Sequence, residues 1–423
     1  MAVRTGRRNP TEAPALGDTG DSERSATDLA SRWVGSSVLS ASDESFGDKE
    51  NLLTPDAAAF EPGHYGNRGE IVDGWETRRR REPGHDWALV RLGTPGIITS
   101  IDVDTSFFTG NFPESCEVDA CGVEGYPSSA ALLAGDTEWI SIVPRSPLRG
   151  DTHNLFPVSG RRRFTHVRLS IYPDGGVARL RILGHVVPDP RLLDGITVNL
   201  AGSELGAGVV ASSDNFYSSA ASLLRADRAR TMGEGWETRR RRDGGPDFVV
   251  VQLAYLGHVR QVEVDTAHFK YNASESISLH GAAADPPPSV ASPAWTTLLP
   301  RAKLQPDTRH MFPVGPSAPV SAVRLDAYPD GGVSRLRVMG ELDPSARRRA
   351  GLHWFNALPA AQATGCLTLA GMPPAAAAPI VGGRPLSSAW RTEALDRLGT
   401  RHTREASAHL AALAAMLDGV PGR

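Results

Sequence analysis

The residues best suited to chemistry lie in an eight-residue run, Gly-Trp-Glu-Thr-Arg-Arg-Arg-Arg, that occurs at 74–81 and again at 235–242. If the run is extended, alternate side chains share a face, so Glu76, Arg78 and Arg80 should lie together. Four successive guanidinium groups repel one another unless carboxylates or an anionic ligand neutralise them. Because guanidinium groups bind carboxylates through paired hydrogen bonds, the run predicts a site for a small anion. A solvated edge or an ion-pair network at a domain interface is the alternative.

Acidic and amide side chains accompany both copies of the run. The matching residues of the two copies are Glu76 with Glu237, Arg78 with Arg239, Arg80 with Arg241, Asp104 with Asp265, and Asn111 with Asn272. An aspartate that closes a strand can line the loop end of a β-sandwich, where ligands usually bind. The same aspartate can instead cap the following turn, so both roles are open for Asp104 and Asp265.

Histidine distinguishes the two copies, because His153 of the first aligns with Arg309 of the second and His310 of the second aligns with Asn154 of the first. His310 occupies the position that Asn154 has in the first copy, and histidine is the commonest general acid or base near pH 7. A lone histidine is more often structural. The sequence has no spacing that specifies a metal site, no nucleophile elbow, no phosphate loop and no dinucleotide fingerprint. The candidate chemistry therefore rests on carboxylates, arginines and one histidine.

The duplication extends far beyond the run. Residues match at an offset of 171 upstream of the run, of 161 from the run onward and of 156 from Trp139 onward. In the last part, Tyr-Pro-Asp-Gly-Gly-Val occurs at 172–177 and at 328–333. Each repeat has about 150 residues, the size of a single domain. Apolar and polar residues alternate in segments such as 86–92, and a Pro-Gly turn is expected before the next strand at Ile98. Many short strands without a long helix indicate an all-β sandwich.

Length and composition place the chain among globular proteins. Its 423 residues, 40% hydrophobic and 22% charged, can bury a large core and suggest two to three domains. A net charge of −3 argues against a nucleic-acid partner. We find neither an apolar stretch of the roughly 18 residues that a membrane span needs nor a signal peptide, so we expect a cytoplasmic protein. Three cysteines form neither a disulfide framework nor a zinc pattern.

The patterns divide the chain into five parts. We expect a disordered leader over 1–30, a first repeat over 31–188, a linker over 189–200 and a second repeat over 201–343. Alanine and leucine then recur at helical spacing, which predicts a small helical tail over 345–423.

Several of these motifs together resemble one family. The doubled arginine run, the doubled Tyr-Pro-Asp-Gly-Gly-Val and an Asp-Thr-x-x-Phe-x-x-Asn segment ending at Asn111 are similar to allantoicases over about residues 35 to 343. The order of strand signals also resembles galactose-binding-like jelly rolls. The resemblance implies two tandem jelly-roll β-sandwich repeats and hydrolysis of allantoate to ureidoglycolate and urea in purine breakdown. Such an enzyme is a hydrolase of carbon–nitrogen bonds in linear amidines.

The tail has a resemblance of its own. Its opening, from Leu352, is similar to the start of ureidoimidazoline decarboxylases, but the His-Pro segment of those enzymes is missing. This favours an inactive remnant or a docking element.

The allantoicase resemblance suggests a role for each candidate residue. Allantoate carries one carboxylate and two ureido groups, so guanidinium groups would bind the carboxylate and amides would bind the ureido groups. Acids and a histidine would transfer protons. We expect the catalytic residues to be Glu76, Glu237, Asp104, Asp265 and His310. We expect the substrate-binding residues to be Arg78, Arg80, Arg239, Arg241, Asn111 and Asn272.

Cofactor and partners follow from the same residues. The sequence requires no cofactor, although oxygen-rich ligands could hold a divalent metal such as manganese. We expect a small-molecule substrate, no nucleic acid, no membrane and a homo-oligomer. Two other functions stay open: a non-catalytic carbohydrate- or anion-binding module, because jelly rolls are frequently binding modules, and a regulatory subunit that docks through its tail.

Overall fold

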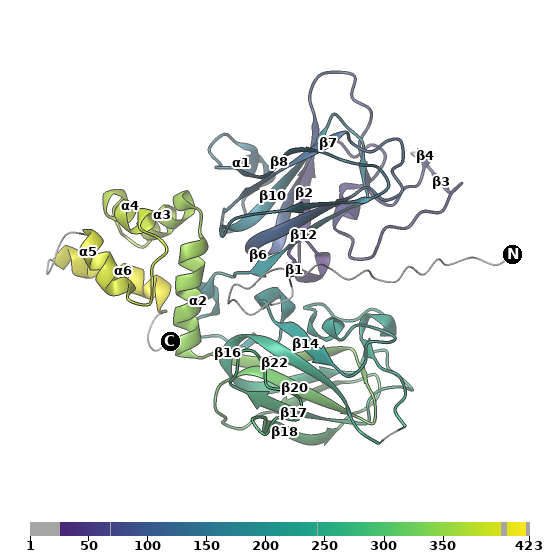
Figure 1. Cartoon of the computed structure of the whole chain (residues 1–423), viewed down its shortest axis with the longest axis vertical. Helices are drawn as coiled ribbons and strands as arrows, with labels where there is room; N and C mark the ends of the chain where they lie inside the picture. Colours follow the sequence, from purple (N-terminus) through teal and green to yellow (C-terminus); the bar gives the residue numbers. More distant parts are fainter. Residues whose placement is uncertain (1–25, 68, 243, 399–403, 420–423) are drawn as a thin grey trace.

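The computed structural model describes residues 26–67, 69–242, 244–398 and 404–419. Figure 1 shows two β-rich repeats arranged along the long axis and a helical domain at their side. This architecture confirms the predicted all-β class with two tandem β-sandwich repeats and a helical C-terminal tail. Most of the predicted leader, up to residue 25, lies outside the described residues, and the first strand begins at Thr27.

The strands of the first repeat are β1 (Thr27–Asp28), β2 (Ser37–Ala41), β3 (Tyr65–Gly66), β4 (Gly69–Glu70), β5 (Trp75–Glu76), β6 (Asp86–Asp104), β7 (Ser115–Cys121), β8 (Ile140–Pro147), β9 (His153–Pro157), β10 (Arg163–Tyr172), β11 (Gly176–Val177) and β12 (Arg179–Val186). Those of the second repeat are β13 (Val198–Asn199), β14 (Gly208–Ser212), β15 (Trp236–Glu237), β16 (Asp247–Asp265), β17 (Ser276–Ala282), β18 (Thr296–Lys303), β19 (Arg309–Pro313), β20 (Val320–Tyr328), β21 (Gly332–Val333) and β22 (Arg335–Leu342).

One long strand builds both layers of the first sandwich. The first half of β6 pairs with β2 and β10, whereas its second half pairs with β9 and β12. Residues 173–178 connect the end of β10, beside Asp86, to the start of β12, beside Asp104. Because so short a link joins these ends, both ends of β6 lie at one end of the sandwich, which we call the loop end.

The predicted Pro-Gly turn within this region is wrong. Pro95 and Gly96 lie inside β6, where the strand bends from one layer into the other. A β-carbon on Gly96 would overlap the carbonyl of His185 on the neighbouring strand, so the close approach of the two strands requires glycine there. The Pro-Gly pair correctly predicted that the chain changes direction here, but the change is a bend within one strand instead of a turn between two strands.

The second repeat copies this arrangement through β16, which pairs with β14 and β20 and then with β19 and β22. Each sandwich has its own core of alternating apolar residues, and a fully buried tryptophan closes each core, Trp75 in one and Trp236 in the other. Each of the two predicted repeats therefore has its own hydrophobic core. The repeats contact each other directly where Thr94 donates to the carbonyl of Glu204 at 2.8 Å.

The helices are α1 (Ser129–Leu133), α2 (Pro344–Ala357), α3 (Ala360–Leu369), α4 (Pro374–Gly382), α5 (Trp390–Leu398) and α6 (Arg404–Leu417). The short 3-10 helices are η1 (Arg32–Val34), η2 (Lys49–Leu53), η3 (Pro190–Leu193), η4 (Ser203–Leu205), η5 (Ala220–Leu224) and η6 (Met232–Glu234). The last five α-helices enclose a third core that also includes Val187 and Ile97 of the first repeat.

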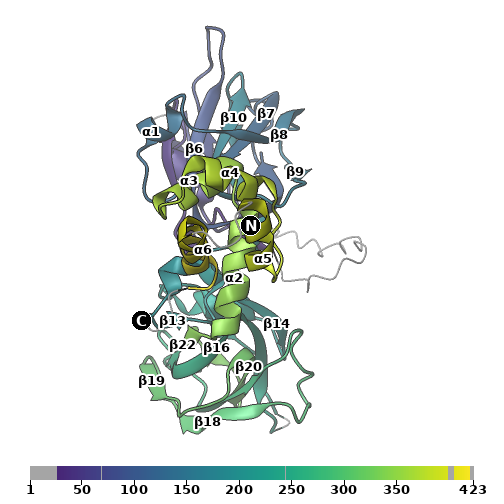
Figure 2. The ribbon, with the colours of Figure 1, turned by 90° about the vertical axis from the view of Figure 1, so that its left-hand side faces the viewer.

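Helix α2 continues from the last strand of the second repeat and runs alongside the junction of the repeats (Figure 2). Its Arg347 is buried and binds Asp194 of the linker at 2.6 Å. Gln362 on α3 donates to Glu124 of the first repeat at 2.7 Å. The helical domain therefore touches both the linker and the first repeat. Among the described residues, none of the helices is long and apolar enough to cross a membrane.

Candidate active site

A carboxylate and an amide meet at the loop end of each repeat. Asn111 donates from Nδ2 to Oε1 of Glu76 at 2.7 Å, and Asn272 donates to Glu237 at the same distance. Both glutamates are half-buried. Burial raises the pKa of Glu76 above its ordinary value, against the opposing effect of the Asn111 hydrogen bond. A carboxylate with a raised pKa accepts a proton more readily at neutral pH, which is what a general base requires.

The doubled Tyr-Pro-Asp-Gly-Gly-Val turn positions this pair. Gly176 pairs with Glu76 across β5 and β11, and its N–H donates to the carbonyl of Asn111 at 2.8 Å. A β-carbon at Gly176 would overlap the Phe108 ring, so only glycine allows the turn to reach the loop. Asp174 in the turn accepts from the backbone N–H of Arg80 at 2.7 Å. The turn is therefore a scaffold for the site, with its aspartate bound to backbone.

The arginines do not follow the alternation expected of a strand. Within the first copy of the run, only Trp75 and Glu76 are in a strand, and the chain after Glu76 is irregular. Arg80 binds Asp86 at 2.8 Å, whereas Arg78, whose side chain is 75% exposed, lies 3.4 Å from Asp43. Glu76, Arg78 and Arg80 therefore contact different partners.

The arginines of the second repeat border a pocket of about 550 Å³. It is lined by Ser213, Asp214, Arg239, Arg240, Arg241, Arg242 and Asp247. Arg239 stacks on Phe216 at 4.2 Å and lies 3.4 Å from Asp214, with a side chain 64% exposed. Arg241 is tied to Asp247 at 3.0 Å. The exposed guanidinium groups leave this pocket suited to an anionic ligand.

Two aspartates at the start of the long strands were not among the expected site residues. Asp86 and Asp247 are almost fully buried, and each uses one oxygen to accept from a serine and an arginine. The other oxygen of each has no hydrogen-bond partner among the described residues. Their recurrence at one offset in both copies was visible in the sequence, but their burial was not.

Asp104 and Asp265 close the long strands and are buried. Asp104 accepts from the N–H and the hydroxyl of Ser106 at 2.8 and 2.6 Å, and Asp265 accepts from the N–H of Ala267 at 2.9 Å. This is the geometry of a cap over the following turn. The turn leads into the loop that carries Asn111 or Asn272, so both aspartates support the Glu–Asn pairs.

His310 and Asn154 perform the same backbone contacts. His310 accepts at Nε2 from the N–H of Gln305 at 2.8 Å, and its Nδ1 lies 3.1 Å from the carbonyl of Val264. Asn154 accepts from the N–H of Arg149 at 2.9 Å and donates to the carbonyl of Val103 at 3.0 Å. Both ring nitrogens of His310 are thus engaged with backbone, which leaves neither for a ligand.

A different histidine has the geometry of an acid–base pair. Nδ1 of His153 lies 2.7 Å from Asp102, and the side chain of His153 is 62% exposed. Partial burial opposes the charged ring, but the hydrogen bond and charge of Asp102 outweigh it and raise the pKa of His153. The second repeat has Arg309 and Glu263 in these places, joined by an ion pair. Sequence comparison of the copies noted this difference without indicating the contact.

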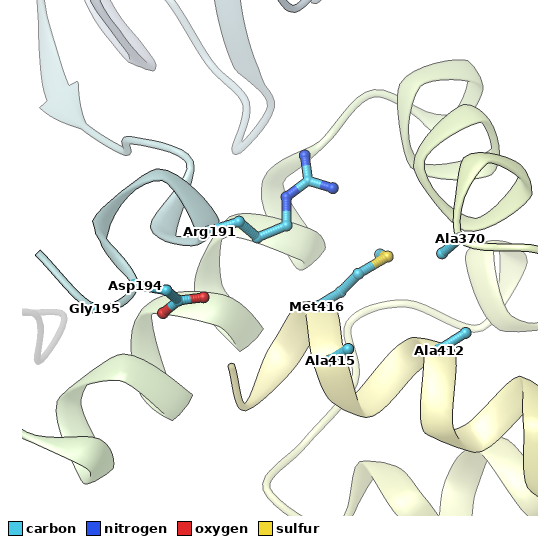
Figure 3. A pocket seen from close by; sticks show the side chains of 7 residues that line it. All are labelled: Arg191, Asp194, Gly195, Ala370, Ala412, Ala415 and Met416. Atoms are coloured by element: carbon cyan, nitrogen blue, oxygen red, sulfur yellow. The ribbon is translucent and has the colours of Figure 1, made fainter. Parts of the chain in front are cut away.

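A second pocket, of about 510 Å³, lies between the linker and the helical domain (Figure 3). Its charged residues are already paired: Arg191 binds Asp189, and Asp194 binds Arg347. The remaining wall contains alanines and Met416. Within the described residues, no cluster of three or more histidine, cysteine or acidic side chains could hold a metal ion.

Two tandem β-sandwiches, each with a carboxylate, an amide and arginines at its loop end, define a duplicated jelly-roll protein equipped to bind and hydrolyse a small anion. The allantoicase repeat model matches residues 27–187 and 198–343. The chain belongs to the allantoicase family, as the sequence resemblance predicted. Its activity class is therefore that of the family, hydrolysis of a carbon–nitrogen bond in a linear amidine.

Curated relatives and a solved structure agree with this assignment. A probable allantoicase of Nocardia farcinica is 48% identical, over 79% of this chain and 99% of the relative. A probable allantoicase of Streptomyces coelicolor is 44% identical, over 77% of this chain and 88% of the relative. The crystal structure of allantoicase from Saccharomyces cerevisiae is 34% identical, covers 74% of this chain and 93% of its own, and superposes with a TM-score of 0.63.

Proposed function

We propose that the protein hydrolyses allantoate to ureidoglycolate and urea, and that the loop end of each repeat is where it does so. The observation that carries this location is the doubled Glu–Asn pair, with Glu76–Asn111 and Glu237–Asn272 each at 2.7 Å. Since both copies keep the pair in one geometry, each repeat has its own site. Exposed arginines of the two runs, Arg78 and Arg239, would supply the positive charge that an anionic substrate needs.

The reaction breaks the bond between the central carbon of allantoate and one ureido nitrogen. That nitrogen keeps the bonding electrons, takes a proton and leaves as urea, while the oxygen of water bonds to the central carbon. Glu76 and Glu237 would remove the proton from water, and the protonated carboxyl can then supply a proton to the leaving nitrogen. One water is consumed, and the carboxylate is regenerated.

The other expected residues take supporting roles in this proposal. Arg78 and Arg239, which are exposed, would bind the carboxylate, whereas Arg80 and Arg241 hold buried aspartates. Asn111 and Asn272 orient the glutamates and retain a side-chain oxygen for a ureido N–H. Asp104, Asp265 and His310 would position the loops instead of transferring protons.

The direct test measures urea and ureidoglycolate from purified protein and allantoate. We expect a Glu76→Gln/Glu237→Gln double variant to lose on the order of a hundredfold to ten-thousandfold in turnover, because glutamine cannot accept the proton. Manganese and EDTA are added in separate reactions, since a divalent metal stays a prediction from the sequence.

His310→Asn is the matched control, because the first repeat already makes the same contacts with Asn154. It should retain turnover. Full activity in a folded double glutamine variant would move the site elsewhere, and no urea from wild-type protein would favour the anion-binding module.

We also propose a cytoplasmic location and a homo-oligomer, both expected from the sequence. Cell fractionation and light scattering of the purified protein test them.

A further inference from the structure

A buried carboxylate borders the arginine pocket of the second repeat. Asp247 is 2% exposed and uses only Oδ1, which accepts from the hydroxyl of Ser213 at 2.8 Å and from Arg241 at 3.0 Å. Its Oδ2 is buried without a hydrogen-bond partner in the described part of the chain. Buried polar atoms are nearly always satisfied, so an open acceptor beside a pocket calls for a donor.

The first repeat repeats the arrangement atom for atom. Oδ1 of Asp86 accepts from Ser42 at 2.9 Å and from Arg80 at 2.8 Å, and its Oδ2 also has no partner among the described residues. An unsatisfied buried oxygen costs on the order of 1–3 kcal/mol. Since the two copies have diverged at many other positions, the same open acceptor in both indicates a use rather than an accident of packing.

The charges around this acceptor define what can fill it. The surrounding arginines attract an anion, but a substrate carboxylate placed against Asp247 would be repelled. An amide-type N–H placed there would satisfy Oδ2, while a carboxylate of the same ligand contacts the exposed Arg239. A ligand that meets both demands carries a carboxylate and, a few atoms away, an N–H donor.

We propose that Asp247 and Asp86 accept hydrogen bonds from a ureido group of the substrate, and so select anions bearing ureido groups over plain carboxylates. This inference rests on the proposed function. The arginines by themselves would bind any small carboxylate. A site built to accept a substrate N–H rejects analogues that lack it, because the buried acceptor is then left unpaired.

Asp247 lines a pocket whose other walls are mainly arginines. Arg239, Arg240 and Arg242 are exposed, so their side chains can move as a ligand enters, whereas Arg241 is half-buried and stays on Asp247. A ligand would therefore contact exposed arginines that can change conformation, and an aspartate that Arg241 holds in place.

The test compares two ligands in an Asp86→Asn/Asp247→Asn variant. Asparagine keeps the shape and the Oδ1 acceptor for serine and arginine, but places an N–H₂ group where the open oxygen was. Binding of allantoate and of malonate, which has no N–H group, is measured by calorimetry in the Glu76→Gln/Glu237→Gln background to limit turnover. We expect the affinity for allantoate to fall by about tenfold to a hundredfold, and that for malonate to stay the same or rise.

Equal weakening of both ligands would overturn the proposal, since it would indicate a general defect of the pocket. Unchanged allantoate affinity would overturn it as well. The single variants Asp86→Asn and Asp247→Asn serve if the double variant misfolds. Each should weaken the binding of allantoate at one of the two sites and should not weaken the binding of malonate at either site. Failure of wild-type protein to release urea would count against the proposed function alone, because the binding comparison needs no turnover.

Discussion

At the scale of single residues, the two copies act as an internal experiment. His310 and Asn154 differ in chemistry but make the same two backbone contacts, from which we infer that this position holds the loop in place. His153 and Arg309 differ in another way. Both pair with a carboxylate on the neighbouring strand, yet only the histidine can lose its charge near neutral pH.

That difference predicts a pH-dependent contribution to stability. Asp102 and Asp104 on β6 and Arg181 on β12 surround His153, and its pKa is raised above its ordinary value of 6.5. A raised pKa means that the pair stabilises the fold fully below about pH 6.5 and that this contribution is lost as pH rises through the folded pKa. We therefore expect His153→Gln to lower the free energy of unfolding more at about pH 5.5 than at about pH 8.5.

The effect should stay below about 1 kcal/mol because the imidazole is largely exposed. Urea denaturation at both pH values measures it. Arg309→Gln is the control, since arginine keeps its charge across this range and its loss should cost the same at both. An equal loss for His153→Gln at the two pH values would contradict the assignment.

At the scale of elements, alternation and duplication made most of the fold predictable. The segment at 86–92 forms a strand as expected, because one buried face imposes a period of two. The single strand across Pro95 was not foreseen, because the pairing that changes at the bend lies far away in sequence. The partners of the arginine run were equally hidden, since the chain leaves the strand after Glu76.

Helix α2 depends on one buried arginine for its position. Arg347 binds Asp194 through two nitrogens, at 2.6 and 3.0 Å, and donates to the carbonyl of Leu417 at 3.2 Å. Arg347→Ala leaves these acceptors unpaired and should destabilise the helical domain by about 1–3 kcal/mol. Calorimetry should show an earlier transition for that domain, while urea production stays near wild type because both sites lie in the repeats.

The exposed neighbour on the same helix, Arg348, gives the matched control. Arg348→Ala should leave the transition unchanged. A loss of urea production in folded Arg347→Ala protein would instead link the tail to the sites.

At the scale of the whole molecule, two cores and two loop ends imply two sites that work separately. Each repeat has a complete set of glutamate, asparagine, aspartate and arginine. Glu76→Gln and Glu237→Gln as single changes should therefore each leave a substantial share of turnover, whereas the double variant loses it. Initial rates at saturating allantoate measure the fraction of wild-type turnover that each single variant retains. If either single change abolished all turnover, the two repeats would have to share one site.

The helical domain also fixes an order of events during synthesis. Val187, at the end of the first repeat, is 3% exposed, and it packs with Ile97 against residues from Trp354 to Leu417. Those residues are the last of the described chain to leave the ribosome. During synthesis, Ile97 and Val187 of the first repeat therefore stay exposed until the second repeat and the five helices have been made. The helical domain completes a surface that the first repeat leaves open.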